Sequence, residues 1–168
     1  MPHTEQQVET NPPSRFSKPL VIKGTEGMII KYAKCCHPLP GDAILGHINA
    51  GRGVVIHTNQ CPHIKDVKRK KADIIELAWN DHVDGEFVVP ISVEIRHQRG
   101  LIATLATKIN SLDTNIESIN VYDIDAYNSR VDITISVKNR IHLARIMRHI
   151  RNLKSVTRIN RVKTISSK

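Results

Sequence analysis

The sequence predicts an α+β protein, in which a small β-rich module with one short helix precedes a ferredoxin-like βαββαβ domain. Residues 89–95 and 131–137 alternate apolar residues with polar or smaller ones, a pattern typical of strands with one buried face. Residues 101–112 and 143–153 repeat apolar residues at helical spacing. Upstream of residue 80 the apolar runs are short and separated by glycine-containing turns, which favours a β-rich module.

The first module is expected at residues 20–82. Residues 1–19 before it are polar and proline-bearing, which indicates a disordered lead-in or linker. A polar, turn-rich stretch at residues 80–86 marks the boundary with the second domain. The strands of the module are expected at residues 20–22, 28–30, 43–48, 54–57 and 75–79.

Two turns and a helix connect these strands. Gly51-Arg52-Gly53 predicts a hairpin turn between the strands of residues 43–48 and 54–57. After that hairpin, Thr58 or Asn59 is expected to cap a short helix that runs through Ile64 and Val67.

The second domain, residues 86–166, is expected to follow the order strand-helix-strand-strand-helix-strand. We expect Asn128 and Ser129 in the turn between its second and third strands, and Asn139 as the cap of its second helix. The last strand is expected at residues 156–165. Two helices on one face of a four-stranded antiparallel sheet give the ferredoxin-like arrangement.

Positive charge is concentrated at the end of the chain. The 168 residues carry a formal net charge of +9, yet residues 138–168 hold ten of the 25 basic residues and none of the 16 acidic ones. A solvated helix face normally mixes signs, so this segment indicates an anionic partner. No aromatic residue lies there, which favours contact with phosphates over base stacking. The residues expected to contact RNA or another anionic partner are Arg140, Arg145, Arg148, Arg151, Arg158, Arg161 and Lys163.

Composition excludes other classes. No run of about 18 apolar residues exists to cross a membrane, and the polar N-terminus lacks the apolar core of a secretory signal. Three cysteines, two of them adjacent, make a poor disulfide framework. We therefore expect a protein of the reducing cytoplasm with no membrane partner.

The cysteines and one histidine form a candidate metal site. Zinc needs four ligands, and Cys35, Cys36, His57 and Cys61 supply that number of thiolates and imidazoles. A helical turn between His57 and Cys61 would place both side chains on one face. Adjacent residues in an extended chain point in opposite directions, so Cys35 and Cys36 reach one ion only across a kinked loop.

Two alternatives to zinc stay open from the residues alone. One cysteine can pack as a small apolar side chain, with the other in a loop and His57 at a strand end. A redox or nucleophilic role for Cys35 or Cys36 requires a lowered thiol pKa.

Several motifs occur in order along residues 18–165. They are Cys35-Cys36-His37-Pro38-Leu39-Pro40-Gly41-Asp42, Gly46-His47, Gly51-Arg52-Gly53-Val54-Val55-Ile56-His57, Cys61, His97-Gln98-Arg99-Gly100-Leu101-Ile102-Ala103 and residues 139–147. Together they resemble the C-terminal regulatory half of the RelA/SpoT (p)ppGpp synthetases/hydrolases, and most closely the SpoT branch.

The resemblance implies a zinc-finger-like or ribosome-intersubunit module followed by an ACT domain. Cys35, Cys36, His57 and Cys61 match the cysteine and histidine positions of that family. The loop around Gly100 matches the place where ACT domains often hold an amino acid, which implies an amino-acid site at His97, Gln98, Gly100 and Leu101. From the residues alone, Gly100 is more simply a turn glycine beside a helix start.

The implied function is a non-catalytic regulatory region of the stringent response. No hydrolase, synthetase or TGS motif occurs in the chain, so we expect a fragment of a longer enzyme. It would contact the ribosome, tRNA or the catalytic half of that enzyme. The alternative is an amino-acid-sensing ACT module that forms a homodimer and binds a small amino acid near Gly100.

Overall fold

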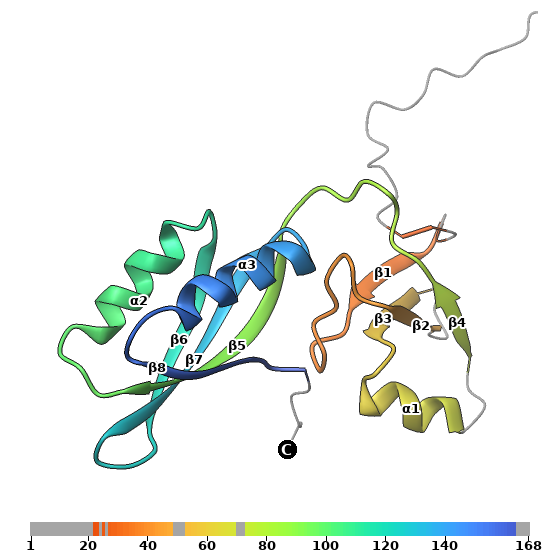
Figure 1. Cartoon of the computed structure of the whole chain (residues 1–168). Coiled ribbons are helices and arrows are strands. Elements are labelled where there is room, and N and C mark those ends of the chain that lie inside the picture. The colour runs from red at the N-terminus through yellow and green to blue at the C-terminus, as the bar shows by residue number, and fades with distance from the viewer. Residues whose placement is uncertain (1–21, 24, 26, 49–52, 70–72, 164–168) are drawn as a thin grey trace, which may run out of the picture.

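The computed structural model describes residues 22–23, 25, 27–48, 53–69 and 73–163. A β-rich module and an α+β domain follow one another along the chain, joined by an irregular segment (Figure 1). The expected lead-in at residues 1–19 lies outside the described residues. Within the described part, no helix has the length and apolarity needed to cross a membrane.

The second domain has the predicted ferredoxin-like order. Its strands are β5 (Phe87–Arg96), β6 (Asn115–Asp123), β7 (Asn128–Val137) and β8 (Val156–Arg161). They pair antiparallel in the spatial order β6-β7-β5-β8. Helices α2 (Leu101–Asn110) and α3 (Arg140–Arg151) cover one face of this sheet (Figure 1).

An aliphatic core lies between that sheet and the two helices. The alternate residues of β5 and β7 that face the helices are fully buried, as the sequence pattern predicts: Val89, Ile91, Val93, Ile95, Val131, Ile133, Ile135 and Val137. Leu105 and Ile109 from α2 and Ile146 and Ile150 from α3 complete the cluster. Each such side chain contributes about 1.5–3 kcal/mol relative to its exposed state, so burial dominates the stability of this domain.

Helix α3 begins as the sequence predicts. Asn139 is extended, and its side-chain oxygen accepts a hydrogen bond from the His142 N–H at 2.8 Å. His142 Nδ1 accepts a hydrogen bond from the Lys138 N–H at 3.0 Å, so its Nε2 is the atom that donates to the Leu112 carbonyl at 3.1 Å. This buried imidazole therefore ties the start of α3 to the segment after α2.

Three details of the second domain differ from expectation. Asn128 and Ser129 open β7 instead of forming the preceding turn, because the Asp125 carboxylate accepts the N–H groups of Tyr127 and Asn128 and closes the turn earlier. Ile102, within the apolar repeat of residues 101–112, is exposed, and so is the apolar Val121 of β6. Strand β8 ends at Arg161, whereas the predicted strand covers residues 156–165.

The first module is a second four-stranded sheet with one helix. Its strands are β1 (Ile29–Tyr32), β2 (Ile44–Ile48), β3 (Gly53–Thr58) and β4 (Ile74–Leu77), in the spatial order β1-β3-β2-β4. The predicted pairing of β2 with β3 is antiparallel, whereas β1 runs parallel to β3. Residues 51 and 52 of the predicted hairpin turn lie outside the described residues.

Helix α1 (Pro62–Arg69) starts later than predicted. Thr58 is the last residue of β3, and neither Thr58 nor Asn59 directly precedes the helix. Proline suits the first helical position because the N–H it lacks would have no partner there. The expected strand at residues 75–79 also differs, since β4 ends at Leu77 and Trp79 forms an isolated bridge with Ile22.

The two modules share apolar surface. Leu39, from the loop after the cysteines, is fully buried in the core of the second domain. Trp79 stacks on Tyr32 with ring centroids 5.9 Å apart, and Phe87 meets both rings edge-on. Trp79 also packs against the cores of both modules. The modules are therefore packed on each other and not merely joined by a linker.

Candidate metal centre and inter-module contact

A tight turn brings the two adjacent cysteines to one side of the chain. Strand β1 pairs with β3, and the Ala33 N–H continues this pairing by donating to the Ile56 carbonyl at 2.9 Å. The His37 N–H then donates back to the Ala33 carbonyl at 3.0 Å, and His37 adopts a left-handed φ of 43°. The chain thus reverses at Cys35 and Cys36, and this is the kinked loop that a shared ligand role requires.

The other two residues come from β3 and the start of α1. His57 lies in β3, while Cys61 directly precedes α1 and its N–H donates to the Thr58 carbonyl at 3.1 Å. The expectation of a helical turn between His57 and Cys61 is therefore wrong. A strand end followed by a non-helical turn brings the two side chains together instead.

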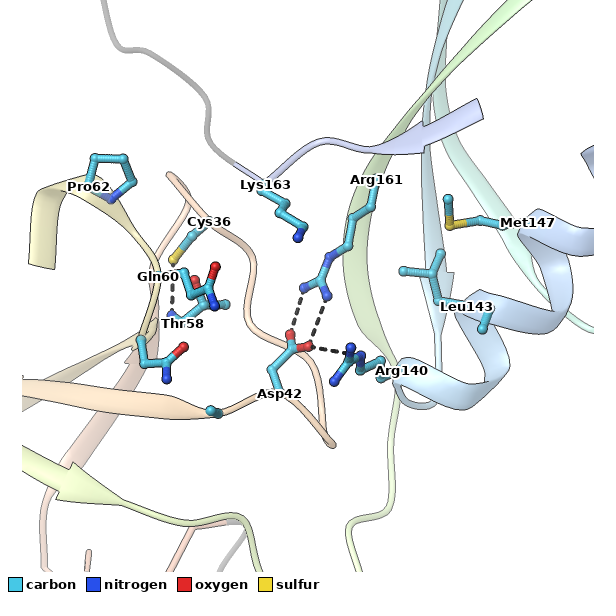
Figure 2. A pocket seen from close by; sticks show the side chains of 13 residues that line it. Cys36, Asp42, Thr58, Gln60, Pro62, Arg140, Leu143, Met147, Arg161 and Lys163 are labelled. Atoms are coloured by element: carbon cyan, nitrogen blue, oxygen red, sulfur yellow. Dashed lines mark hydrogen bonds and ion pairs between the residues drawn. The ribbon is translucent and has the colours of Figure 1, made fainter. Parts of the chain in front are cut away.

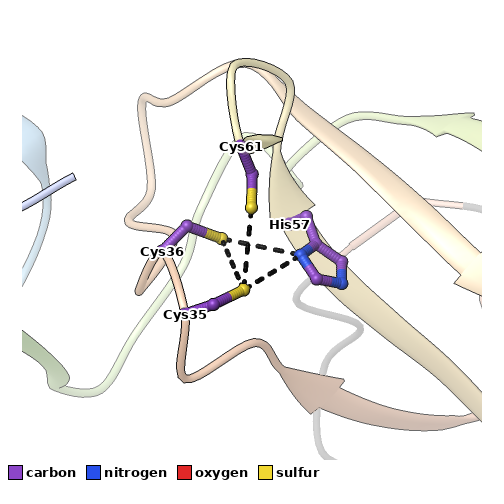
Figure 3. A group of neighbouring side chains, drawn as sticks. All are labelled: Cys35, Cys36, His57 and Cys61. Carbon is purple, nitrogen blue, oxygen red and sulfur yellow. Dashed lines mark hydrogen bonds between the residues drawn. The ribbon is translucent and has the colours of Figure 1, made fainter. Parts of the chain in front are cut away.

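The four side chains converge on one point (Figure 3). Cys35 Sγ lies 3.9 Å from Cys36 Sγ and 3.6 Å from Cys61 Sγ. His57 Nδ1 lies 3.4 Å from Cys35 Sγ and 3.7 Å from Cys36 Sγ. All four candidate ligand atoms lie within 4.8 Å of one another.

Four of the six separations match a tetrahedral metal site. Bonds of about 2.3 Å to sulfur and about 2.0–2.1 Å to nitrogen place tetrahedral ligand atoms about 3.5–3.8 Å apart. The four distances between ligand atoms given above agree with that spacing to within a few tenths of an ångström. The Thr58 N–H also donates to Cys36 Sγ at 3.4 Å, a contact that supports a thiolate. The cluster of Cys35, Cys36, His57 and Cys61 could therefore hold a metal ion.

The protonation of these groups argues against a reactive thiol. Burial and the neighbouring sulfurs raise the pKa of Cys35 to about 12, and burial also raises the pKa of Cys36. A nucleophilic or redox-active cysteine needs a lowered pKa. Burial and two neighbouring histidines lower the pKa of His57, which keeps its imidazole neutral and able to bind a metal.

Two of the cysteines also pack as small apolar side chains. Cys36 and Cys61 are buried and pack with Ala33 and Ile64 in a small cluster of their own. All three cysteines are free thiols. The cysteines thus help to fill the space under α1 at the same time as their sulfurs face one another.

An ion pair joins the cysteine loop to the end of the second domain (Figure 2). Arg161 donates to both carboxylate oxygens of Asp42, at 2.9 and 2.6 Å, and to the His37 carbonyl at 2.9 Å. The side chains of Asp42 and Arg161 are only 8% and 13% exposed. The Trp79 indole N–H donates to the Asp42 carbonyl, and the Arg140 N–H to the Pro40 carbonyl.

This contact is not apparent from the sequence, in which Asp42 belongs to a motif without an assigned role and Arg161 to the set expected to contact RNA. The one available signal was the isolated carboxylate of Asp42 in an otherwise apolar Pro-Leu-Pro-Gly-Asp segment.

The remaining basic residues predicted to meet an anionic partner stay on the surface. Arg145, Arg148 and Arg151 are exposed on α3, on the side away from buried Leu143, Ile146 and Ile150, and Arg158 is exposed on β8. Arg140 lies 4.0 Å from Asp42, while Lys163 lines a cavity beside Arg161. The predicted basic residues therefore fall into two groups. One is exposed on α3 and β8, and the other lies at the contact between the modules.

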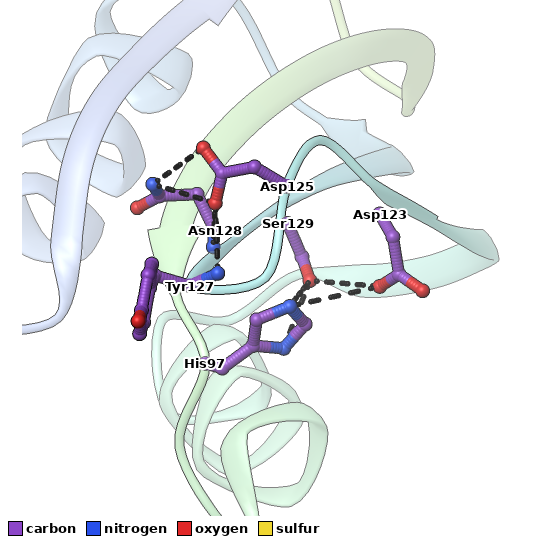
Figure 4. A network of polar contacts seen from close by, with 6 residues as sticks. All are labelled: His97, Asp123, Asp125, Tyr127, Asn128 and Ser129. Atoms are coloured by element: carbon purple, nitrogen blue, oxygen red, sulfur yellow. Dashed lines mark hydrogen bonds and ion pairs between the residues drawn. The ribbon is translucent and has the colours of Figure 1, made fainter.

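The residues predicted to hold an amino acid lie in the loop before α2 and are partly engaged with the protein itself. The His97 ring lies 3.2 Å from the hydroxyl oxygen of Ser129, which in turn donates to Asp123 (Figure 4). Gln98 accepts a hydrogen bond from Ser155. Gly100 has a left-handed φ of 74°, and a Cβ added there would meet no atom within 4 Å. Leu101 is half-buried as the first residue of α2.

Comparison with known proteins identifies both modules. The family described as the RelA/SpoT RIS domain matches residues 20–80, and the family described as the ACT domain matches residues 84–161. The protein is thus a tandem of a RIS domain and an ACT domain, neither of which is a catalytic domain.

The curated relatives agree with these matches. The bifunctional (p)ppGpp synthase/hydrolase SpoT of Escherichia coli K12 is 36% identical over 142 residues, 84% of this chain and 20% of the relative. The bifunctional (p)ppGpp synthase/hydrolase RelA of Mycobacterium tuberculosis is 28% identical over 141 residues, 84% of this chain and 19% of the relative. The crystal structure of the ACT domain from GTP pyrophosphokinase of Chlorobium tepidum is 25% identical, with a TM-score of 0.41, and the match covers 46% of this chain and 99% of that one.

The chain belongs to the RelA/SpoT family and corresponds to its RIS and ACT region. It spans about a fifth of the length of the curated relatives it matches.

Proposed function

We propose that this chain is the non-catalytic regulatory region of a bifunctional (p)ppGpp synthetase/hydrolase and acts in the cytoplasm. It controls guanosine tetraphosphate metabolism by contacting the ribosome or tRNA, the catalytic half of the enzyme, or both. The observation that carries the proposal is the RIS domain followed by an ACT domain whose helix α3 exposes four arginines and no carboxylate.

RNA is the partner that this face fits. Arg145 and Arg148 point away from the core side of α3, and Arg158 is exposed on β8. The sequence from Lys138 to Lys163 contains no carboxylate, and Glu94 of β5 is the register partner of Arg158. A surface of this kind binds phosphates by releasing counterions, and its affinity falls as salt rises.

Charge reversal tests this contact. The triple variant Arg145→Glu, Arg148→Glu and Arg158→Glu is expected to lose most of its salt-dependent binding to purified ribosomes in a sedimentation assay. A control with the same change in net charge reverses three exposed residues elsewhere, Lys31, Arg96 and Arg99, and is expected to retain binding. Equal binding by the triple variant and the unchanged protein would reject the basic-face proposal.

We also propose that the four-residue cluster binds zinc. The support is a donor set of three sulfurs and one imidazole nitrogen, in which four of the six separations are close to tetrahedral. Four protein ligands leave no open position for a water or a substrate, so the ion would hold the cysteine loop, β3 and α1 together.

Metal analysis of protein purified without a histidine tag tests this assignment. We expect one zinc per chain, lost in the variant Cys35→Ser and retained in His47→Gln, which changes a histidine of β2 outside the cluster. Cobalt substitution should give the visible absorption of a tetrahedral thiolate site. Less than a tenth of an equivalent of zinc after purification in zinc-supplemented medium would reject the assignment.

An amino-acid sensor is a second proposal. The open space around the Gly100 backbone supports it, because a ligand carboxylate could approach the loop at the start of α2. Calorimetry with branched-chain and other amino acids tests it, with sedimentation to detect the dimer that an ACT sensor would form. Heat of binding that disappears in Gly100→Val would support the sensor, whereas no heat with any amino acid would reject it.

A further inference from the structure

A cavity of about 470 Å³ lies between the two modules (Figure 2). One wall comes from the first module, through Asp42, Ala43 and residues 58–60. The facing wall comes from α3 and the end of β8. Its volume is within the range of sites that enclose small molecules. None of the four residues predicted to hold an amino acid lines it.

The cavity is positively charged. Arg140, Arg161 and Lys163 line it, against the single carboxylate of Asp42. Both oxygens of that carboxylate are already engaged, because they accept from Arg161 and one also accepts from the Leu39 N–H at 2.8 Å. Two further cations line the cavity: Lys163, whose side chain is directed toward the cavity in Figure 2, and Arg140, which is 66% exposed and holds only a long contact of 4.0 Å to Asp42.

The rest of the lining is divided between apolar and neutral polar groups. Leu143, Ala144 and Met147 form an apolar strip along α3, with Pro62 on the opposite wall. The neutral amides of Asn59 and Gln60 complete the wall formed by the first module. A ligand that satisfies this lining carries one anionic group and an apolar portion.

We propose that this cavity binds a small organic acid whose anionic group lies beside Lys163 and Arg140 and whose apolar part packs against Leu143 and Met147. A free amino acid fits less well, because its ammonium group would enter a cavity lined by three cations whose single carboxylate, Asp42, is already paired with Arg161. The ligand would contact both modules at once and so favour their packed arrangement. This inference does not depend on ribosome or zinc binding.

Three probes with the same six-carbon chain separate the elements of the proposal. In ¹⁵N-resolved titrations of the whole chain at constant ionic strength, hexanoate is expected to shift the amide signals of Asn59, Gln60 and Ala144 in a saturable way. Hexylamine, which replaces the anion with a cation, is expected to leave them in place. Norleucine, which adds an ammonium group to the same carboxylate, is expected to bind at least tenfold more weakly.

Two variants and a control locate the site. Ala144→Glu adds bulk and negative charge to the cavity wall on an exposed position of α3, and should weaken hexanoate binding at least tenfold. Lys163→Gln should weaken it about threefold, as expected for one exposed charge contact. Lys154→Gln removes an exposed charge that does not line the cavity and should leave the dissociation constant unchanged.

Circular dichroism of each variant verifies that the fold is retained. Equal shifts with hexylamine and hexanoate, or hexanoate shifts confined to residues outside the cavity, would overturn the proposal. Undiminished hexanoate binding by a folded Ala144→Glu protein would also overturn it.

Discussion

Replacing Arg161 by methionine should destabilise the packing of the two modules strongly. Arg161→Met keeps most of the side-chain length but leaves the Asp42 carboxylate buried without its bidentate partner. Breaking a buried pair in this way costs about 3–5 kcal/mol. The Leu39 N–H and Arg140 still contact the carboxylate in the variant, so we expect a loss near the lower limit, about 3 kcal/mol.

The assay is chemical denaturation read by tryptophan fluorescence. The chain has a single tryptophan, and Trp79 lies at the contact, where its indole N–H donates to the Asp42 carbonyl at 3.1 Å. The set comprises the unchanged protein, Arg161→Met, Asp42→Asn and the double variant. The double variant should be less destabilised than the sum of the single variants by about 2 kcal/mol or more, since it leaves no unpaired buried charge. Arg145→Met, at an exposed position, should change stability by less than about 0.5 kcal/mol.

Two outcomes would refute this reasoning. A loss below about 1 kcal/mol in Arg161→Met would mean that the pair is solvated in solution. Strict additivity in the double variant would mean that Asp42 and Arg161 act on stability independently of each other.

Three further predictions follow from single sites. Gly46→Ala should lower the free energy of unfolding by about 1–3 kcal/mol in urea denaturation, because the new Cβ would lie 2.6 Å from Leu77 Cδ1 and 2.7 Å from Val54 Cγ2. A loss below about 0.5 kcal/mol would contradict this packing. Asn139→Ala should cost about 1 kcal/mol by removing the side-chain cap of α3, whereas Asn152→Ala at the other end of the helix should be close to neutral in the same assay. Zinc binding should release at least two protons at pH 7 and weaken as pH falls, because the raised pKa values of Cys35 and Cys36 keep both thiols protonated until the metal displaces their protons. Calorimetry in buffers of different ionisation enthalpy measures that release, and an observed enthalpy independent of the buffer would contradict it.

The best-predicted elements are those whose residue pattern is a local signal of burial or of a helix start. The alternation in β5 and β7 and the cap at Asn139 are local signals, and each appears in the structure as expected. Exposed Ile102 and Val121 show the limit of this reasoning, because an apolar residue at suitable spacing need not be covered by another element.

The site was harder to predict because its geometry depends on non-local contacts. The four candidate ligands could be named from their residue types, but the turn that brings Cys35 and Cys36 together requires a left-handed His37, which no glycine signals. The pairing of Asp42 with Arg161 spans 119 residues, and sequence gave no reason to choose Arg161 over the other nine basic residues near the end of the chain.

The ion pair between Asp42 and Arg161 also sets an order of events during synthesis. The ribosome adds about 5–20 residues per second, so roughly 6–24 s separate the addition of Asp42 from that of Arg161, 119 residues later. All four candidate ligands have been added once Cys61 is in the chain, about 100 residues before Arg161. Until the core residues 87–159 have been added, Leu39 has no complete core to enter, and the cysteine loop is not yet covered by the second domain. If the cluster binds zinc as proposed, the ion can therefore bind the growing chain before the two modules close on each other.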